Sequence, residues 1–325
     1  MYDFLNTLSG FIWGPITLIL ILGTGIFLSL GLKGFTFTYI LVAFKQIFRK
    51  DEKATDGEIT SFQSLTTALS ATVGTGNIAG VATAIYIGGP GAVFWMWVSA
   101  LFGMATKYAE AFLAIKYREK NANGETVGGP MYYIKNGLSK NYIVFAYLFA
   151  LAGMIAALGI GNGVQVNSVS QVIESEFGIS AFTVGIFIAV LVALVILGGI
   201  KSIGKITSKL VPLMSAIYIL GGLWIIVLNY TEVTYVFNLI TTSAFTSTAA
   251  TGGFAGATVW MALRYGVARG VFSNEAGLGS SPIAHAAANT NNPAKQGMIS
   301  MLEPLIDTLI VCTITAFVIL MSNLW

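Results

Sequence analysis

The sequence predicts an all-α membrane protein with about eight transmembrane helices, two of them broken. Three observations support this prediction: an apolar composition, a one-sided distribution of basic residues, and a pair of glycine-rich interruptions. Of the 325 residues, 55% are hydrophobic and only 10% are charged, and the mean hydropathy is +0.78. A soluble domain carries about 25% charged residues. The chain therefore has too little charge to cover a water-exposed surface.

Eight apolar stretches approach the roughly 20 residues that a helix needs to cross a bilayer. They comprise residues 12–32, 65–87, 93–115, 142–172, 181–197, 210–228, 245–263 and 299–324. The fourth is longer than one crossing, so we expect it to be tilted or to protrude. After the first stretch, residues 33–60 form a cytoplasmic interfacial segment in which residues 35–48 are amphipathic.

Basic residues decide the expected orientation. If the eight stretches alternate in direction, all 17 Lys and Arg residues fall on one side. The positive-inside rule places that side in the cytoplasm and the N-terminus outside. We therefore expect a multi-pass protein of the cell membrane, plasma or inner. The net charge of +3 reflects this sorting and does not support nucleic-acid binding.

Glycine and polar residues interrupt the second and seventh stretches at corresponding places. The second carries ATVGTGNIAG at residues 71–80, and the seventh carries ATGGFAGAT at residues 250–258. A membrane helix can lose its backbone hydrogen bonds only where the freed groups line a cavity or meet a ligand. Paired interruptions in two halves of a membrane protein indicate the central site of a transporter. The alternative is that the small residues only allow close helix packing.

The two interrupted stretches run in opposite directions, as an inverted repeat requires. Residues 1–325 are accordingly interpreted as a single transmembrane domain. Residues 61–228 form its first five-helix repeat, and residues 240–325 begin an inverted second repeat. Because three helices of that second repeat are absent, we expect the sequence to be a C-terminally truncated copy that lacks sodium-driven uptake by itself.

The first interruption supplies the candidate residues Gly74, Thr75, Gly76 and Asn77. Unwinding here would free carbonyls for a cation and an ammonium group. The half-helix that starts near Asn77 would direct its amides at a carboxylate. These groups suit a zwitterionic amino acid. We expect Thr75, Gly76 and Asn77 to bind substrate, and Gly74, Thr75 and Asn77 to bind the cation.

The second interruption adds four candidate substrate-binding residues, Gly252, Gly253, Phe254 and Gly256. Glycine leaves room for the backbone to approach a ligand. Phe254 would then serve as a gate or a wall of the pocket. For the remaining small residues of this stretch we expect close helix packing alone.

Asp307 is a candidate cation-binding residue because no Lys or Arg occurs in the neighbouring stretches. An intramembrane carboxylate without a basic partner is by default a candidate for a cation site or a proton relay. Glu303 and Pro304 precede it closely and suggest proximity to the cytoplasmic edge. A protonated Asp307, or one that faces inner water, is therefore the alternative.

Three motifs resemble those of the alanine/glycine:cation symporter family, also called sodium:alanine symporters. They are GGPGAVFWMWVSALFG at residues 88–103, residues 74–80, and SNEAGLGSSPIAHAA at residues 273–287. The resemblance implies a LeuT-type inverted-repeat fold with one extra N-terminal helix. It also implies cotransport of a small amino acid with sodium. A polar residue of the fourth stretch would face the substrate, and we choose Gln165, with a place in the outer vestibule as the alternative.

Other charged residues receive structural interpretations. Lys107 and Glu110 are three residues apart at the end of the third stretch, which predicts a surface ion pair. His285 is expected on an exposed cytoplasmic helix, without a metal or proton role. Glu275 is a candidate for an inner salt bridge with one of two arginines, Arg264 or Arg269.

The sequence thus predicts a secondary active transporter, not an enzyme, that performs sodium-coupled symport of alanine or glycine by alternating access. Sodium is the expected coupling ion and the only expected metal, and the bilayer and a small amino acid are the expected partners. No nucleotide-binding loop is present, which excludes an ATP-driven pump within this chain. A symporter of another small solute, coupled to sodium or protons, is the first alternative. A nonconducting sensor or a channel is the second, although paired interruptions count against a channel.

Overall fold

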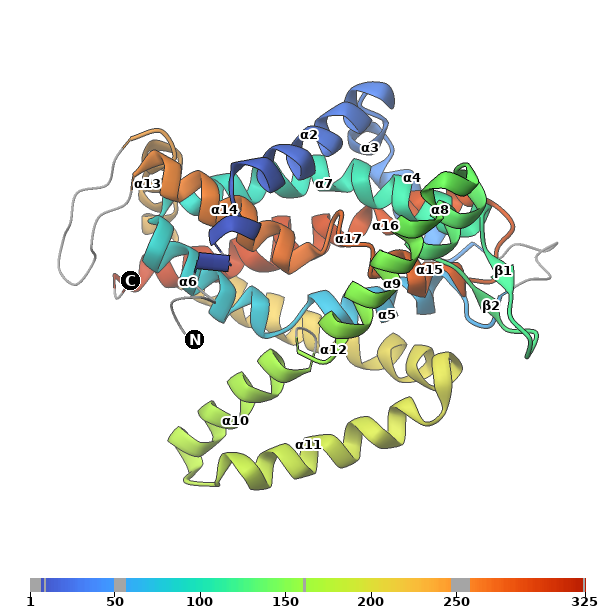
Figure 1. Cartoon of the computed structure of the whole chain (residues 1–325). Coiled ribbons are helices and arrows are strands. Elements are labelled where there is room, and N and C mark those ends of the chain that lie inside the picture. Colours follow the sequence, from blue (N-terminus) through green and yellow to red (C-terminus); the bar gives the residue numbers. More distant parts are fainter. Residues whose placement is uncertain (1–6, 9, 50–56, 160–161, 247–257, 324) are drawn as a thin grey trace.

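The computed structural model describes residues 7–8, 10–49, 57–159, 162–246, 258–323 and 325, and these are mostly helical (Figure 1). The elements are α2 (Pro15–Gly31), α3 (Phe35–Thr38), α4 (Ile40–Ile47), α5 (Ser61–Thr72), η1 (Thr75–Asn77), α6 (Ala79–Gly88), α7 (Gly91–Lys116), β1 (Glu119–Lys120), β2 (Thr126–Val127), α8 (Pro130–Gly137), η2 (Lys140–Tyr142), α9 (Ile143–Ala157), α10 (Gly163–Phe177), α11 (Ala181–Ile196), α12 (Gly199–Leu228), η3 (Tyr230–Glu232), α13 (Val233–Ser243), α14 (Val259–Asn274), α15 (Ser281–Ala286), α16 (Pro293–Ser300), α17 (Leu302–Pro304), η4 (Leu305–Cys312) and α18 (Thr313–Met321). The two short strands pair antiparallel.

Helix α7 is the centre of the bundle, and α2, α14, α15 and α16 pack against it. Two glycines of α14 set its distance from α7. A Cβ atom at Gly266 would lie 2.3 Å from the carbonyl oxygen of Ala92, and one at Gly270 would lie 2.1 Å from Ser99 Oγ. Lipid is as apolar as a leucine side chain, so helices in a bilayer associate largely through such close packing. The absence of a side chain at these two glycines therefore allows α14 to pack closely against α7.

Three apolar clusters lie in the described part of the core, and the two larger ones flank the first broken helix. One joins α6, α7, α13 and α18 through residues such as Ile85, Met96 and Leu320. The other joins α4, α5, α7, α12 and α16 through residues such as Leu69 and Met104. The first cluster contains residues of α6, which follows the η1 turn, and the second contains residues of α5, which precedes it.

Helices α10 and α11 form a hairpin that extends away from the rest of the bundle (Figure 1). Only Ser170 of α10 and Val184 of α11 are buried. The prediction of one long helix over residues 142–172 is wrong, because α9 ends at Ala157 and α10 begins at Gly163. Glycines at 159, 161 and 163 favour such a break, since glycine loses the most conformational freedom in a helix.

In the described part of the chain, five helices are long and apolar enough to cross a membrane: Gly10–Gly31, Gly91–Lys116, Lys140–Ala157, Gly199–Leu228 and Pro293–Met321. The bent pair α5 and η1–α6 would add a sixth span, and α11 is a shorter apolar helix. These helices indicate a multi-pass membrane protein. The count of eight spans stays a prediction, because residues 247–257 of the seventh stretch lie outside the described ranges. The orientation and the inverted repeat stay predictions as well.

Candidate functional site

The first interruption is a sharp turn between two half-helices. Helix α5 ends at Thr72, and the chain is extended at Val73 and Gly74 before η1 begins. The segment of η1 and α6 is bent by 56° relative to α5. Asn77 closes the turn because its Oδ1 accepts a 2.7 Å hydrogen bond from the Gly74 amide. Such a break leaves the last carbonyls of α5 and the first amides of α6 outside a continuous helix.

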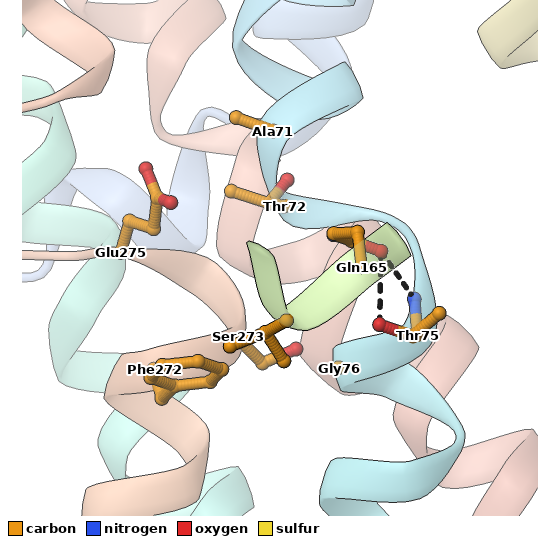
Figure 2. A pocket seen from close by; sticks show the side chains of 9 residues that line it. Ala71, Thr72, Thr75, Gly76, Gln165, Phe272, Ser273 and Glu275 are labelled. Atoms are coloured by element: carbon orange, nitrogen blue, oxygen red, sulfur yellow. Dashed lines mark hydrogen bonds between the residues drawn. The ribbon is translucent and has the colours of Figure 1, made fainter. Parts of the chain in front are cut away.

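Gln165 connects α10 to this turn. The amide and the hydroxyl of Thr75 both donate to Gln165 Oε1, at 3.1 and 2.9 Å (Figure 2). A Cβ atom at Gly74 would lie only 2.8 Å from the same Oε1 atom. Glycine at position 74 therefore leaves the space that Gln165 occupies beside Thr75.

Asn77 lies on the other side of the turn and is 1% exposed. Its Nδ2 donates to Asp307 Oδ1 at 2.6 Å and lies 3.3 Å from the backbone carbonyl oxygen of Asp307. The same nitrogen lies 3.1 Å from Ser273 Oγ and 3.3 Å from Cys312 Sγ. Asn77 thus links the first broken helix to α14 and to the helix that carries Asp307.

Asp307 is fully buried within η4. Ser273 Oγ donates to its Oδ2 at 2.7 Å, and Thr308 Oγ1 donates to the same atom at 2.8 Å. The Thr308 hydroxyl in turn accepts from Asn274 Nδ2 at 3.0 Å. In the described part of the chain, the side chains that donate to Asp307 are uncharged. The helix η4 is a π-helix, a rare conformation that often occurs at functional sites.

A pocket lies beside the turn (Figure 2). Residues from α5 and η1, from α10, and from the end of α14 line it, namely Ala71, Thr72, Thr75, Gly76, Val164, Gln165, Phe272, Ser273 and Glu275. A Cβ atom at Gly76 would meet nothing within 4 Å, so this position borders open space. Ser273 belongs to both regions, because it lines the pocket and also donates to Asp307.

The structure therefore brings together most of the described candidates. Thr75, Gly76 and Gln165 line one pocket, and Gly74 lies next to Gln165. Asn77 and Asp307, which are 230 residues apart in the sequence, are hydrogen-bonded to each other. The four candidates of the second interruption lie outside the described residues, and their role stays a prediction: Gly252, Gly253, Phe254 and Gly256.

The two hydroxyl donors to the Asp307 carboxylate, Ser273 and Thr308, were not among the sequence candidates. Ser273 was noticeable only as the first residue of the motif at 273–287, and a serine near the end of a helix carries no further signal. Thr308 follows Asp307 directly, and a threonine in an apolar helix usually bonds to its own backbone. Only the tertiary structure shows that both hydroxyls meet the carboxylate.

The predicted surface pair of Lys107 and Glu110 is wrong. Lys107 is 0% exposed, and its Nζ lies 2.9 Å from Glu303 Oε2. Glu110 is also buried and accepts a hydrogen bond from the Gly279 amide through Oε1. The i, i+3 spacing allows a local pair, but helix α17 packs against α7 and supplies the nearer carboxylate.

Two further interpretations are corrected. His285 is fully buried, not exposed, and its Nε2 lies 2.6 Å from Glu303 Oε1. Glu275 accepts from the Ser280 hydroxyl, while Arg264 donates to the backbone carbonyls of Trp13 and Gly10. His285 is buried because α15 and α16 pack directly against α7.

Comparison with known proteins gives consistent results. A model of the sodium:alanine symporter family matches residues 1–325. The chain is 52% identical to the sodium/alanine symporter AgcS of Methanococcus maripaludis over 322 residues, which cover 98% of the chain and 70% of that protein. It is 42% identical to a putative sodium/proton-dependent alanine carrier of Bacillus subtilis over 325 residues, 100% of the chain and 65% of the carrier. Identity is 40% to a probable sodium/glutamine symporter of Bacillus subtilis over 315 residues, with coverages of 96% and 64%.

Proposed function

Because the chain belongs to the sodium:alanine symporter family, we propose that it performs symport of alanine or glycine with sodium across the cell membrane. Members of this family are transporters and not enzymes. The observation that carries the proposal is the turn of Thr75–Asn77, which contacts a polar pocket through Thr75 and a buried carboxylate through Asn77. We propose alternating access with the N-terminus outside.

The pocket supports a small zwitterionic substrate. The first amides of α6 carry the partial positive charge of a helix N-terminus, which suits a carboxylate. The Thr75 hydroxyl donates to Gln165 Oε1, and its own oxygen can still accept a hydrogen bond from an ammonium group. The open space at Gly76 would admit a ligand close to the backbone. Residues Gly252, Gly253, Phe254 and Gly256 would close the pocket from the second interruption.

Alanine and glycine are favoured over glutamine by the same geometry. The lining combines a glycine, an alanine and short hydroxyl side chains with Phe272 and Val164. Its two longer polar side chains are Gln165 and Glu275, and Glu275 already accepts from the Ser280 hydroxyl. A longer side chain that ended in an amide would need its own polar partners when buried. Gln165 already satisfies the Thr75 hydroxyl and amide. One relative is named as a glutamine symporter, so glutamine is the competitor to test.

The cation site would lie on the Asp307 side of the turn. Sodium is a hard cation that takes oxygen ligands, and unwound carbonyls of broken helices serve this purpose in transporters. Asp307 would supply the negative charge, and Gly74, Thr75 and Asn77 would supply carbonyl, hydroxyl and amide oxygens. The hydroxyls of Ser273 and Thr308 already lie 2.7 and 2.8 Å from Asp307 Oδ2 and extend this oxygen-rich set.

Binding and uptake together test the proposal. Purified protein should gain thermal stability from alanine in sodium chloride and much less in choline chloride, since a ligand stabilises the state that it binds. Glutamine and glycine, added separately, establish the substrate. A pH titration in choline shows whether protons replace sodium. Labelled alanine uptake into proteoliposomes, with the Methanococcus maripaludis symporter as a positive control, tests transport. Equal stabilisation in sodium and choline at every pH would contradict sodium coupling.

A further inference from the structure

A buried charged cluster lies outside the pocket, and Glu303 is its centre. The Glu303 carboxylate contacts Lys107 Nζ at 2.9 Å and His285 Nε2 at 2.6 Å. Ser281 Oγ donates to both carboxylate oxygens at 3.0 and 2.7 Å, and Ser300 Oγ donates to Oε1 at 2.8 Å. Lys107, His285 and Glu303 are each 0% exposed. One carboxylate therefore joins α7, α15, α16 and α17.

Stability alone is a weak explanation for such a cluster. Removing two charges from water costs several kcal/mol per ion, and buried ion pairs can often be replaced by apolar residues without loss of stability. What the cluster supplies is defined geometry, because four side chains from three helices donate to the one carboxylate of Glu303. The position of α17 relative to α7 and α15 is thereby fixed.

Glu303 precedes Asp307 by four residues, about one helical turn. Pro304 lies between them and lacks a backbone amide hydrogen, and the π-helix η4 starts at Leu305. Regular α-helical hydrogen bonds therefore do not determine the position of this segment by themselves. The side-chain bonds of Glu303 fix its start, and Asp307 projects from its first turn towards Asn77.

We propose that Glu303 is a positioning residue that sets the place of the Asp307 carboxylate beside Asn77. The inference about sodium affinity rests on the proposed cation site, but the inference about position does not. Changes at Glu303 would shift η4, lengthen the contact between Asp307 and Asn77, and weaken cation binding without touching the pocket.

The native thiol of Cys312 provides a direct probe, since it is the only cysteine in the sequence. Cys312 ends η4, is 2% exposed, and lies 3.3 Å from Asn77 Nδ2. We would measure the rate of its alkylation by N-ethylmaleimide in the wild type, in Glu303→Asp, which keeps the charge on a shorter arm, and in Glu303→Gln. Ser281→Ala removes one donor and leaves the ion pair, so it serves if the other variants do not fold. Glu110→Gln is the matched control, a buried carboxylate on α7 instead of the Asp307 helix.

We expect about a tenfold faster alkylation in the Glu303 variants, because local opening exposes the thiol, a smaller increase in Ser281→Ala and no change in Glu110→Gln. The half-saturating sodium concentration for thermal stabilisation should rise with the alkylation rate. In an Asp307→Asn background, the Glu303 changes should no longer affect sodium binding, as expected for coupled residues. Unchanged Cys312 alkylation in folded Glu303 variants would overturn the positioning role. If Asp307→Asn leaves sodium binding unchanged, the proposed cation site fails, while the alkylation result still decides the role of Glu303.

Discussion

Asp307→Asn should separate sodium binding from the stability of the cation-free protein. The substitution preserves shape, and the surrounding donors can adapt to it. The new amide oxygen can accept from Asn77 Nδ2, which now donates to Oδ1 at 2.6 Å. The new amide nitrogen can donate to the hydroxyls of Ser273 and Thr308, which accept as well as donate. The variant also removes a buried charge, so we expect the cation-free stability to change by no more than about 1–2 kcal/mol.

The effect on sodium should be large. Two unit charges 4 Å apart interact by about 4 kcal/mol at an effective dielectric constant of 20. Loss of this energy raises a dissociation constant by roughly a thousandfold. At a sodium concentration a hundred times the wild-type dissociation constant, the wild type gains about 2.7 kcal/mol of stability, and the variant should gain almost nothing.

The assay compares thermal unfolding of the two purified proteins in sodium chloride and choline chloride at one ionic strength. Glu110→Gln is again the control, because Glu110 is buried but bonds to the Gly279 amide instead of this site. It should keep the full sodium response. An Asp307→Asn protein that sodium stabilises as strongly as the wild type would refute the assignment of Asp307 to the cation.

The remaining predictions concern the turn and the packing of α14. Asn77→Ala leaves the Gly74 amide and Asp307 Oδ1 without the partners that now lie 2.7 and 2.6 Å away. It should therefore lower the free energy of unfolding by about 2 kcal/mol or more and abolish alanine binding. Normal alanine binding by this variant would contradict the proposed site. Gly74→Ala places a Cβ atom 2.8 Å from Gln165 Oε1 and should weaken alanine binding in a titration, whereas Gly80→Ala, with open space around its Cβ, should not. Gly266→Ala brings a Cβ within 2.3 Å of a backbone oxygen of α7 and should lower stability by about 1–3 kcal/mol in thermal unfolding. Gly153→Ala is the control and should be neutral, because a Cβ there meets nothing within 4 Å.

Local signals explain what the sequence predicts well here. The two glycines and the asparagine of GTGN at 74–77 are unusual within an apolar stretch, and the unwinding that they favour is determined within a few residues. The structure accordingly has an extended Gly74 followed by the short η1 helix. The high apolar content likewise predicts membrane helices directly from composition. Neither inference requires knowledge of which helices are neighbours.

Contacts between distant helices could not be derived in this way. Lys107 has a carboxylate three residues away, so a local pair was the reasonable prediction, but Glu303 lies nearer in the folded chain. His285 looked peripheral because its surroundings are small and polar residues, and its burial depends on α5, α15 and α16 meeting. The same limit applied to Asp307, whose missing basic partner was visible in the sequence but whose contact with Asn77 was not.

The turn itself suggests how cation and substrate would be coupled. Asn77 Oδ1 accepts from the Gly74 amide, while Asn77 Nδ2 donates to Asp307. Thr75, which lies between Gly74 and Asn77 in the sequence, contacts Gln165 in the pocket. A cation that drew the Asn77 amide oxygen towards Asp307 would release the Gly74 amide and alter the position of Thr75. Coupling of this kind is reciprocal, so alanine should raise sodium affinity by the same factor by which sodium raises alanine affinity. Titrating each ligand at fixed concentrations of the other tests this equality.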